Sequence, residues 1–189
     1  MPLNGYLFQK QLIAHSACTL ARMKTGSLFR LMKKEVPNYL ECLHYFNDQC
    51  SPFGYEICIL SQSSESLLIY VYHTQKLQTL LERPSIQNFL SAFGYTCQPC
   101  QQAIMHLRQR LNEQSSFPHE IGIFLGYPLK DVQAFIEHEK ECLCIGYWKV
   151  YGNVKNTQKT FERFDCCTKT MKTKISQGEP LERILKKLN

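Results

Sequence analysis

The chain has 189 residues, of which 44% are hydrophobic and 20% are charged. This length and balance suit one globular domain with its own core, and they exclude a disordered or fibrous protein. No apolar run approaches the roughly 18 residues of a membrane span, and the first residues lack the pattern of a secretion signal. We therefore expect a cytoplasmic protein without a membrane partner that forms a single domain over residues 1–189.

Hydrophobic periodicity first predicts two helices, over residues 18–35 and 39–49. The β-branched and aromatic runs at 55–60 and 67–72 follow, separated by a serine-rich segment, and together they predict a β-hairpin. Apolar spacing then predicts three further helices near residues 75–82, 85–92 and 100–113.

In the second half of the chain, segments with the period of a helix alternate with segments that favour a strand. The apolar run at 120–125 predicts a strand, although its period also allows a helical start, and residues 129–136 predict a helix after a proline. Residues 144–151 predict another strand, and two basic helices over 155–176 and 180–188 end the chain. This order indicates an α+β fold with helices packed on a small, mostly antiparallel sheet.

The net charge of +6 comes from the C-terminal helical segment, residues 155–189, and from the residues 149–154 just before it. Residues 149–189 hold ten basic and four acidic side chains, whereas the two signs balance before them. Such a segment favours an acidic partner, either an acidic carrier protein or a phosphorylated cofactor arm. Nucleic acid is not expected, because the segment lacks a reading motif and interleaved aromatic side chains. A solvated, lysine-rich helix face is the simpler alternative.

The chain contains ten cysteines but no export signal, so we expect mostly reduced thiols. Soft metal ligands could come from Cys142 and Cys144, or from the pairs at 97/100 and 166/167. No second Cys-x-x-Cys lies at a zinc-ribbon distance, and small buried hydrophobic residues are the alternative explanation. We therefore predict neither a metal nor another cofactor, and a metal at the 142/144 pair stays open.

Cys18 is the leading candidate nucleophile. It stands where the first predicted helix begins, and the free amides and partial positive charge of a helix N-terminus favour a thiolate. A packed small hydrophobic residue is the alternative. His15 lies three residues before it, close enough in a helix to serve as a base or simply to lie beside it.

Three stretches of the chain resemble a known family. Residues 117–132 (FPHEIGIFLGYPLKDV), residues 142–152 (CLCIGYWKVYG) and the region of His15 and Thr19 resemble uncharacterised proteins from anaerobic clostridia, over nearly the whole chain. Family members read close to His-Cys-x-Pro-Thr-Leu, whereas this chain has Cys18 at the position before the threonine. A nucleophile there would mark a specialised branch, similar to the papain-like amide synthases of the closthioamide pathway. The resemblance also implies genes for iron transport and flavodoxin nearby.

The order of residues in the chain is similar to that of papain-like proteins, so we expect a papain-like cysteine protease-type fold. A thiol of this kind needs an imidazole and a group that orients the ring. His119, about a hundred residues after Cys18, is the expected base. Asp131, Glu120 or an unspecified asparagine would orient it, and Asp131 is favoured because a neighbour on a strand points to the opposite face. Gln11 would complete the oxyanion hole with the Cys18 amide.

These residues predict a cysteine-dependent acyltransferase. It would take an acyl group from a thioester on an acyl or peptidyl carrier protein and pass it to a small amine, which is amide synthesis. A papain-like hydrolase would use the same residues. The other classes that stay open are a metal, haem or iron-homeostasis accessory protein, which would use Cys142 and Cys144, and a pure interaction module. A structural hydrogen bond is the alternative role for His119.

Overall fold

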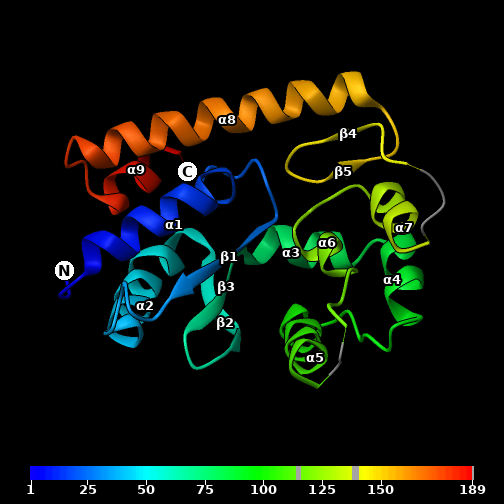
Figure 1. Cartoon of the computed structure of the whole chain (residues 1–189), viewed down its shortest axis with the longest axis horizontal. Helices are drawn as coiled ribbons and strands as arrows, with labels where there is room; N and C mark the ends of the chain where they lie inside the picture. The colour runs from blue at the N-terminus through cyan, green and yellow to red at the C-terminus, as the bar shows by residue number, and fades with distance from the viewer. Residues whose placement is uncertain (114–115, 138–140, 189) are drawn as a thin grey trace. The chain divides into compact units, whose positions relative to one another are not determined.

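The protein is described by a computed structural model that covers residues 1–113, 116–137 and 141–188. It is an α+β protein with a small antiparallel sheet, as predicted (Figure 1). The chain divides into two compact units, one of residues 1–76 with 167–189 and the other of residues 77–166. The single domain over residues 1–189 stays a prediction.

The first unit is built around a three-stranded antiparallel sheet of order β1-β3-β2. Its strands are β1 (Gly26–Met32), β2 (Tyr55–Gln62) and the central β3 (Ser66–His73), nearly all of which is buried because it has neighbours on both edges. Helices α1 (Gly5–Leu20) and α2 (Tyr39–Cys50) pack on this sheet, and a short 3-10 turn, Ser51–Phe53, precedes β2.

The end of the chain returns to this unit and completes its core. Helix α8 (Val154–Ser176) contributes Met171 and Ile175, and α9 (Leu181–Leu188) contributes Leu181, Ile184 and Leu185. The three α9 residues recur at the three- and four-residue spacing of a helix with one apolar face. Both helices were predicted, with almost the same bounds.

The predicted helix over residues 18–35 is wrong. Helix α1 begins at Gly5 and ends at Leu20, and residues 26–32 form the edge strand β1, paired residue by residue with β3. Ser27, Phe29 and Leu31 point inward on every second residue, which is the period of a strand. Pairing with the buried β3 decides between the two periods, and that pairing is not visible in the local sequence.

The second unit is mainly helical. Its helices are the end of α3 (Thr74–Leu81), α4 (Pro84–Ser91), α5 (Cys100–Glu113), α6 (Ile121–Phe124), α7 (Leu129–Glu137) and the first part of α8. The predictions for α3, α4, α5 and α7 are confirmed. In the part of the chain that the structure describes, no helix is long and apolar enough to cross a membrane.

Two strands predicted in the second unit are wrong. The run at 120–125 forms the short helix α6, in which Ile121, Ile123 and Phe124 are all buried. A run that is apolar on every side can be buried as either element, so its period could not decide. Residues 144–151 form a hairpin, β4 (Cys144–Ile145) and β5 (Lys149–Val150), rather than one strand.

Candidate functional site

Cys18 lies in the last turn of α1, not at the start of a helix. The electrostatic reason for choosing it is therefore wrong, because the carbonyl end of a helix disfavours a thiolate. The amide of such a residue donates to the carbonyl four residues earlier, so the Cys18 amide is not available as an oxyanion donor. The side chain is 4% exposed, and it lies at the boundary between α1 and the end of α8.

The turn after α1 brings a lysine back toward Cys18. Arg22 adopts a left-handed conformation with φ of 55°, its amide donates to the Thr19 carbonyl at 2.9 Å, and the Met23 amide donates to the Cys18 carbonyl at 2.8 Å. This is the pattern of a Schellman cap, normally closed by glycine. The Lys24 amide donates to the same Cys18 carbonyl at 3.1 Å. The cap therefore ties Lys24 to the residue that carries the thiol.

The Cys18 thiol has a hydroxyl and an ammonium group near it. Its Sγ atom lies 3.6 Å from the Thr168 Oγ1 atom on α8, at hydrogen-bonding distance for sulfur. Burial lowers the pKa of Lys24 to about 8, while the Cys18 charge acts in the opposite direction and raises it.

A groove lies between α1 and the end of α8, which run side by side in the first unit (Figure 1). Its volume is about 430 Å³, and its lining includes Gln11 and Ala14 from α1 and Lys172 from α8. Ala14 is one turn before Cys18 on the same face of α1, and Lys172 is one turn after Thr168 on α8. The groove and the Cys18–Thr168 contact therefore follow one helix boundary.

Gln11 lines this groove, but its predicted oxyanion role does not fit the helix. Cys18 is seven positions after Gln11, a rise of about 10 Å along α1, so two turns of the helix separate the two residues. The Gln11 side-chain amide donates to Glu35 at 3.4 Å. The Gln11 amide is therefore directed to Glu35 and lies two helical turns from any oxyanion formed at the Cys18 sulfur.

His15 is exposed and its ring stacks on Phe29, with 5.1 Å between the ring centroids. Burial of part of the ring and the nearby Lys172 charge lower the pKa of His15. The imidazole is thus held in its neutral form, which can accept a proton. The effect on the pKa of His15 means that the Lys172 charge on α8 acts on a residue of α1.

His119, the predicted base, belongs to the second unit, whereas Cys18 belongs to the first. The His119 side chain is exposed, and its ring meets the Phe135 ring edge-on, with centroids 4.9 Å apart. Lys149 covers the same phenylalanine at 5.0 Å. The pairing of the Cys18 thiol with the His119 imidazole stays a prediction, because the two side chains belong to different units of the chain.

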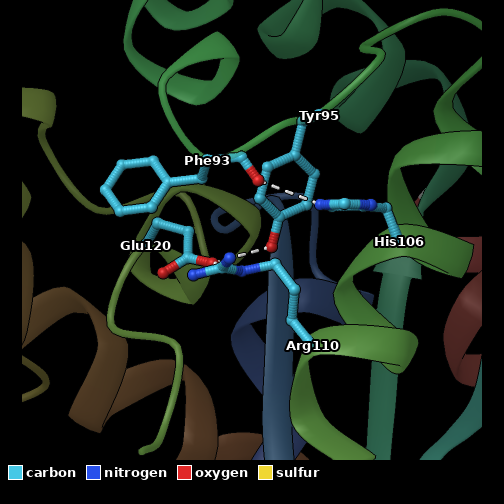
Figure 2. A network of polar contacts seen from close by, with 5 residues as sticks. All are labelled: Phe93, Tyr95, His106, Arg110 and Glu120. Atoms are coloured by element: carbon cyan, nitrogen blue, oxygen red, sulfur yellow. Dashed lines mark hydrogen bonds and ion pairs between the residues drawn. The ribbon is translucent and has the colours of Figure 1, made fainter. Parts of the chain in front are cut away.

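Glu120 is 1% exposed and takes part in a polar network drawn in Figure 2. Its Oε1 atom accepts hydrogen bonds from the Arg110 Nε atom at 2.5 Å and from the Tyr95 hydroxyl at 2.9 Å. Burial and the negative charge of Glu120 raise the pKa of Tyr95. The neighbouring His106 ring is bound to the Phe93 carbonyl at 3.0 Å. These contacts join α5 to the segment before α6, which is a structural role for Glu120.

Asp131, at the start of α7, is also buried and already has partners. Its Oδ2 atom accepts from the Trp148 indole at 2.8 Å, and its Oδ1 atom accepts from the Tyr151 amide at 2.9 Å. The Trp148 ring in turn stacks on Tyr127, with centroids 5.1 Å apart. Asp131 therefore fixes the β4–β5 hairpin to α7, and neither of its oxygen atoms is directed to His119 by a contact in the described part of the chain.

Comparison with known families shows to which family the chain belongs. The model of a family described as Protein of unknown function (DUF3793) matches residues 12–185. The chain belongs to the DUF3793 family. A search of curated proteins finds no match, and a search of solved structures finds none. The matched region of the DUF3793 family contains Cys18, Lys24 and Thr168, and it begins one residue after Gln11.

The two long motifs by which the chain resembled a family have a structural explanation. They contain both buried carboxylates, and they contain glycines that allow close packing. A Cβ atom on Gly122 would lie 2.8 Å from Val132, and one on Gly146 would lie 2.3 Å from the Phe161 ring. In this DUF3793 protein the motifs build the scaffold of the second unit.

The ten cysteines are free thiols. Cys142 and Cys144 are half-buried in and beside the β4–β5 hairpin. Among the residues that the structure describes, no group of three or more histidine, cysteine, aspartate or glutamate side chains is placed to hold a metal ion.

Sequence reasoning missed Lys24 and Thr168. Lys24 lies six residues after Cys18, and a predicted helix ending at Leu20 would have placed it in the turn that caps that helix. Thr168 lies 150 residues from Cys18 in the chain, and no local pattern connects them.

Proposed function

We propose that this DUF3793 protein is a cysteine-dependent acyltransferase in which Cys18 carries the acyl group. The supporting observation is the buried Cys18 thiol, in contact with the Thr168 hydroxyl and within the field of Lys24, whose pKa is about 8. An amine with this pKa is largely neutral at slightly alkaline pH, so it can take the thiol proton and return it later.

The acyl group passes through two balanced steps. Lys24 takes the Cys18 proton, and the thiolate attacks a thioester carbonyl, so that the acyl–cysteine bond forms and the donor leaves as a thiol with the Lys24 proton. A small amine then attacks the acyl–cysteine, the carbon–sulfur bond breaks, and the proton lost by the amine returns through Lys24 to Cys18. His119 is the alternative base for both steps.

Burial of the thiol favours transfer to an amine over hydrolysis. Cys18 is 4% exposed, so bulk water reaches an acyl–cysteine poorly, while a groove of about 430 Å³ along the same helix boundary offers room for the acyl donor. The acyl donor we propose is a thioester on an acidic acyl or peptidyl carrier protein, which the basic side chains of residues 149–189 would attract.

We keep the cysteine chemistry without the papain-like fold, because a papain-like thiol begins a helix and Cys18 ends one. The amide-synthase branch, with its place in antibiotic biosynthesis, rests on the motif resemblance alone. Ten free cysteines support a reducing compartment, and we infer a cytoplasmic location from them.

Acyl transfer to the protein tests this function. Incubation with an S-acyl N-acetylcysteamine thioester, followed by peptide mass spectrometry, is expected to place one acyl group on Cys18 in the wild type and none in Cys18→Ala. Addition of a small amine is expected to remove the group as the amide. Acylation spread over several exposed cysteines, with Cys18 unmodified, would overturn the proposal.

The base is identified by the rate of Cys18 alkylation with iodoacetamide at pH 8. Lys24→Met is expected to slow it about tenfold, because the thiol loses the nearby group that accepts its proton. Lys34→Met, which removes an exposed lysine of the same unit, is expected to leave it unchanged. A loss in His119→Ala with no loss in Lys24→Met would assign the base to the imidazole instead.

A further inference from the structure

We propose that the groove between α1 and the end of α8 binds a small amphipathic anion, with a phosphate or carboxylate head and an apolar chain. The proposal that the groove binds a ligand is argued from the residues that line it. The further proposal that this ligand is the acyl donor rests on the proposed function. Its volume of about 430 Å³ falls within the range of small-molecule pockets.

The polar side chains that can serve a ligand are cationic or neutral. Lys10 and Lys172 line the groove from opposite helices, and none of the described residues that line it is acidic. The Thr173 and Ser176 hydroxyls already donate to backbone carbonyls, at 3.0 and 2.8 Å. The Gln11 amide likewise donates to Glu35, at 3.4 Å, so the two ammonium groups are the donors left for an anionic head.

Two neighbouring contacts show where these charges act. The Lys10 ammonium lies 4.6 Å from the centre of the Tyr6 ring, which holds it at the rim of α1. The Lys172 charge lowers the pKa of His15 on the other helix, so its field crosses the groove. An anion bound beside these two side chains would be attracted by both positive charges.

The floor of the groove is apolar. It is formed by Ile13 and Ala14 of α1 and Ile175 of α8, together with the hydrocarbon stems of the lysines. A free inorganic ion would leave this surface in water, whereas a head group on an apolar chain would cover it. The combination of two cations above an apolar floor therefore selects an amphipathic anion over a simple phosphate.

Cys18 and Thr168 lie further along the same helix boundary, beyond the residues that line the groove. Lys172 is four residues from Thr168, a rise of about 6 Å along α8, and Lys10 is eight residues from Cys18, about 12 Å along α1. A ligand whose anionic head lies between the two lysines can therefore extend its chain along the helix boundary to the Cys18 sulfur. The acyl donor would then carry its negative charge on a flexible chain, about 6 to 12 Å from the reacting carbonyl.

Matched ligands separate the contribution of the charge from that of the chain. Octyl phosphate, octanol and octylammonium share one tail, and each is titrated into the full-length Cys18→Ala protein below its micelle concentration, with binding followed by calorimetry. Octyl phosphate is expected to bind at least tenfold more tightly than octanol, and octylammonium is expected not to bind. Inorganic phosphate is expected to bind more weakly than octyl phosphate.

The lysines are tested on the same protein. Lys172→Met and Lys10→Met are each expected to weaken octyl phosphate binding about fivefold to tenfold and to leave octanol binding unchanged, while Lys34→Met changes neither. Equal affinity for octyl phosphate and octanol, or full binding in both lysine variants, would overturn the proposal. Binding to anionic phospholipid vesicles without binding of free octyl phosphate would also overturn it in favour of a membrane surface.

Failure of the groove and failure of the thiol chemistry give different results. Loss of acyl transfer to Cys18 with intact octyl phosphate binding leaves the groove and removes the proposed function. Acylation of Cys18 that is insensitive to Lys10→Met and Lys172→Met, with no octyl phosphate binding, keeps the function and removes the groove.

Discussion

Asp131 provides the sharpest test of a scaffold role against a catalytic one. Its carboxylate accepts hydrogen bonds from the Trp148 indole at 2.8 Å and the Tyr151 amide at 2.9 Å, in a site where Asp131 is 5% exposed. A hydrogen bond to a charged group contributes about 1.5 kcal/mol or more, so Asp131→Ala loses at least about 3 kcal/mol. Both donors are then left without their acceptor, which adds to that cost.

The single tryptophan of the chain makes this measurable at the site itself. Urea unfolding followed by Trp148 fluorescence is expected to show a midpoint lowered by an amount equivalent to about 3 kcal/mol in Asp131→Ala, with an altered native emission maximum because the indole loses its partner. Asp131→Asn keeps one acceptor oxygen and is expected to lose about half as much.

Asp165→Asn is the matched control. This aspartate accepts from the Tyr147 hydroxyl at 2.8 Å, but it is exposed, so its substitution is expected to change stability by less than about 0.5 kcal/mol. An Asp131→Ala protein as stable as the wild type, with Cys18 acylation abolished, would refute the scaffold role and restore Asp131 as a group that acts on the reaction.

Three further predictions concern the cap, the buried ion pair and the lysine. Arg22→Gly is expected to stabilise the first unit by up to about 1 kcal/mol in chemical denaturation, since a left-handed φ of 55° costs a side chain more than glycine; a destabilised variant would contradict the cap. Glu120→Ala is expected to destabilise by about 3 kcal/mol in thermal unfolding, because it leaves the mostly buried Arg110 guanidinium and the Tyr95 hydroxyl without their acceptor, and Glu113→Ala serves as the exposed comparison. Competitive acetylation with acetic anhydride is expected to give Lys24 a midpoint near pH 8, against the ordinary 10.5. Because the pKa of Lys24 is lower in the native protein than in the unfolded chain, the unfolded chain binds more protons between about pH 8 and 10.5. The stability of the wild type relative to Lys24→Met is therefore expected to rise with pH in that window. A difference in stability that does not change with pH would show that Lys24 titrates normally.

The candidate site was predictable only in part. The sequence selected Cys18 and Gln11, and the structure puts both residues on α1, with Gln11 in a groove between α1 and α8. The two acids chosen as partners of His119 proved to be occupied by Arg110 and Trp148. A motif shows that a carboxylate is present, but the donor it meets is decided by packing.

What the sequence determined by itself was local. The spacing of apolar residues predicted α2, α5, α9 and the β2–β3 hairpin, because a period of 3.6 or 2 is a property of neighbours in the chain. The tertiary structure decided the rest: pairing with β3 made residues 26–32 a strand, and the return of α8 to α1 brought Thr168 to Cys18 from 150 residues away. Such contacts are selected by the burial and hydrogen bonding of the whole unit, which no short window of sequence contains.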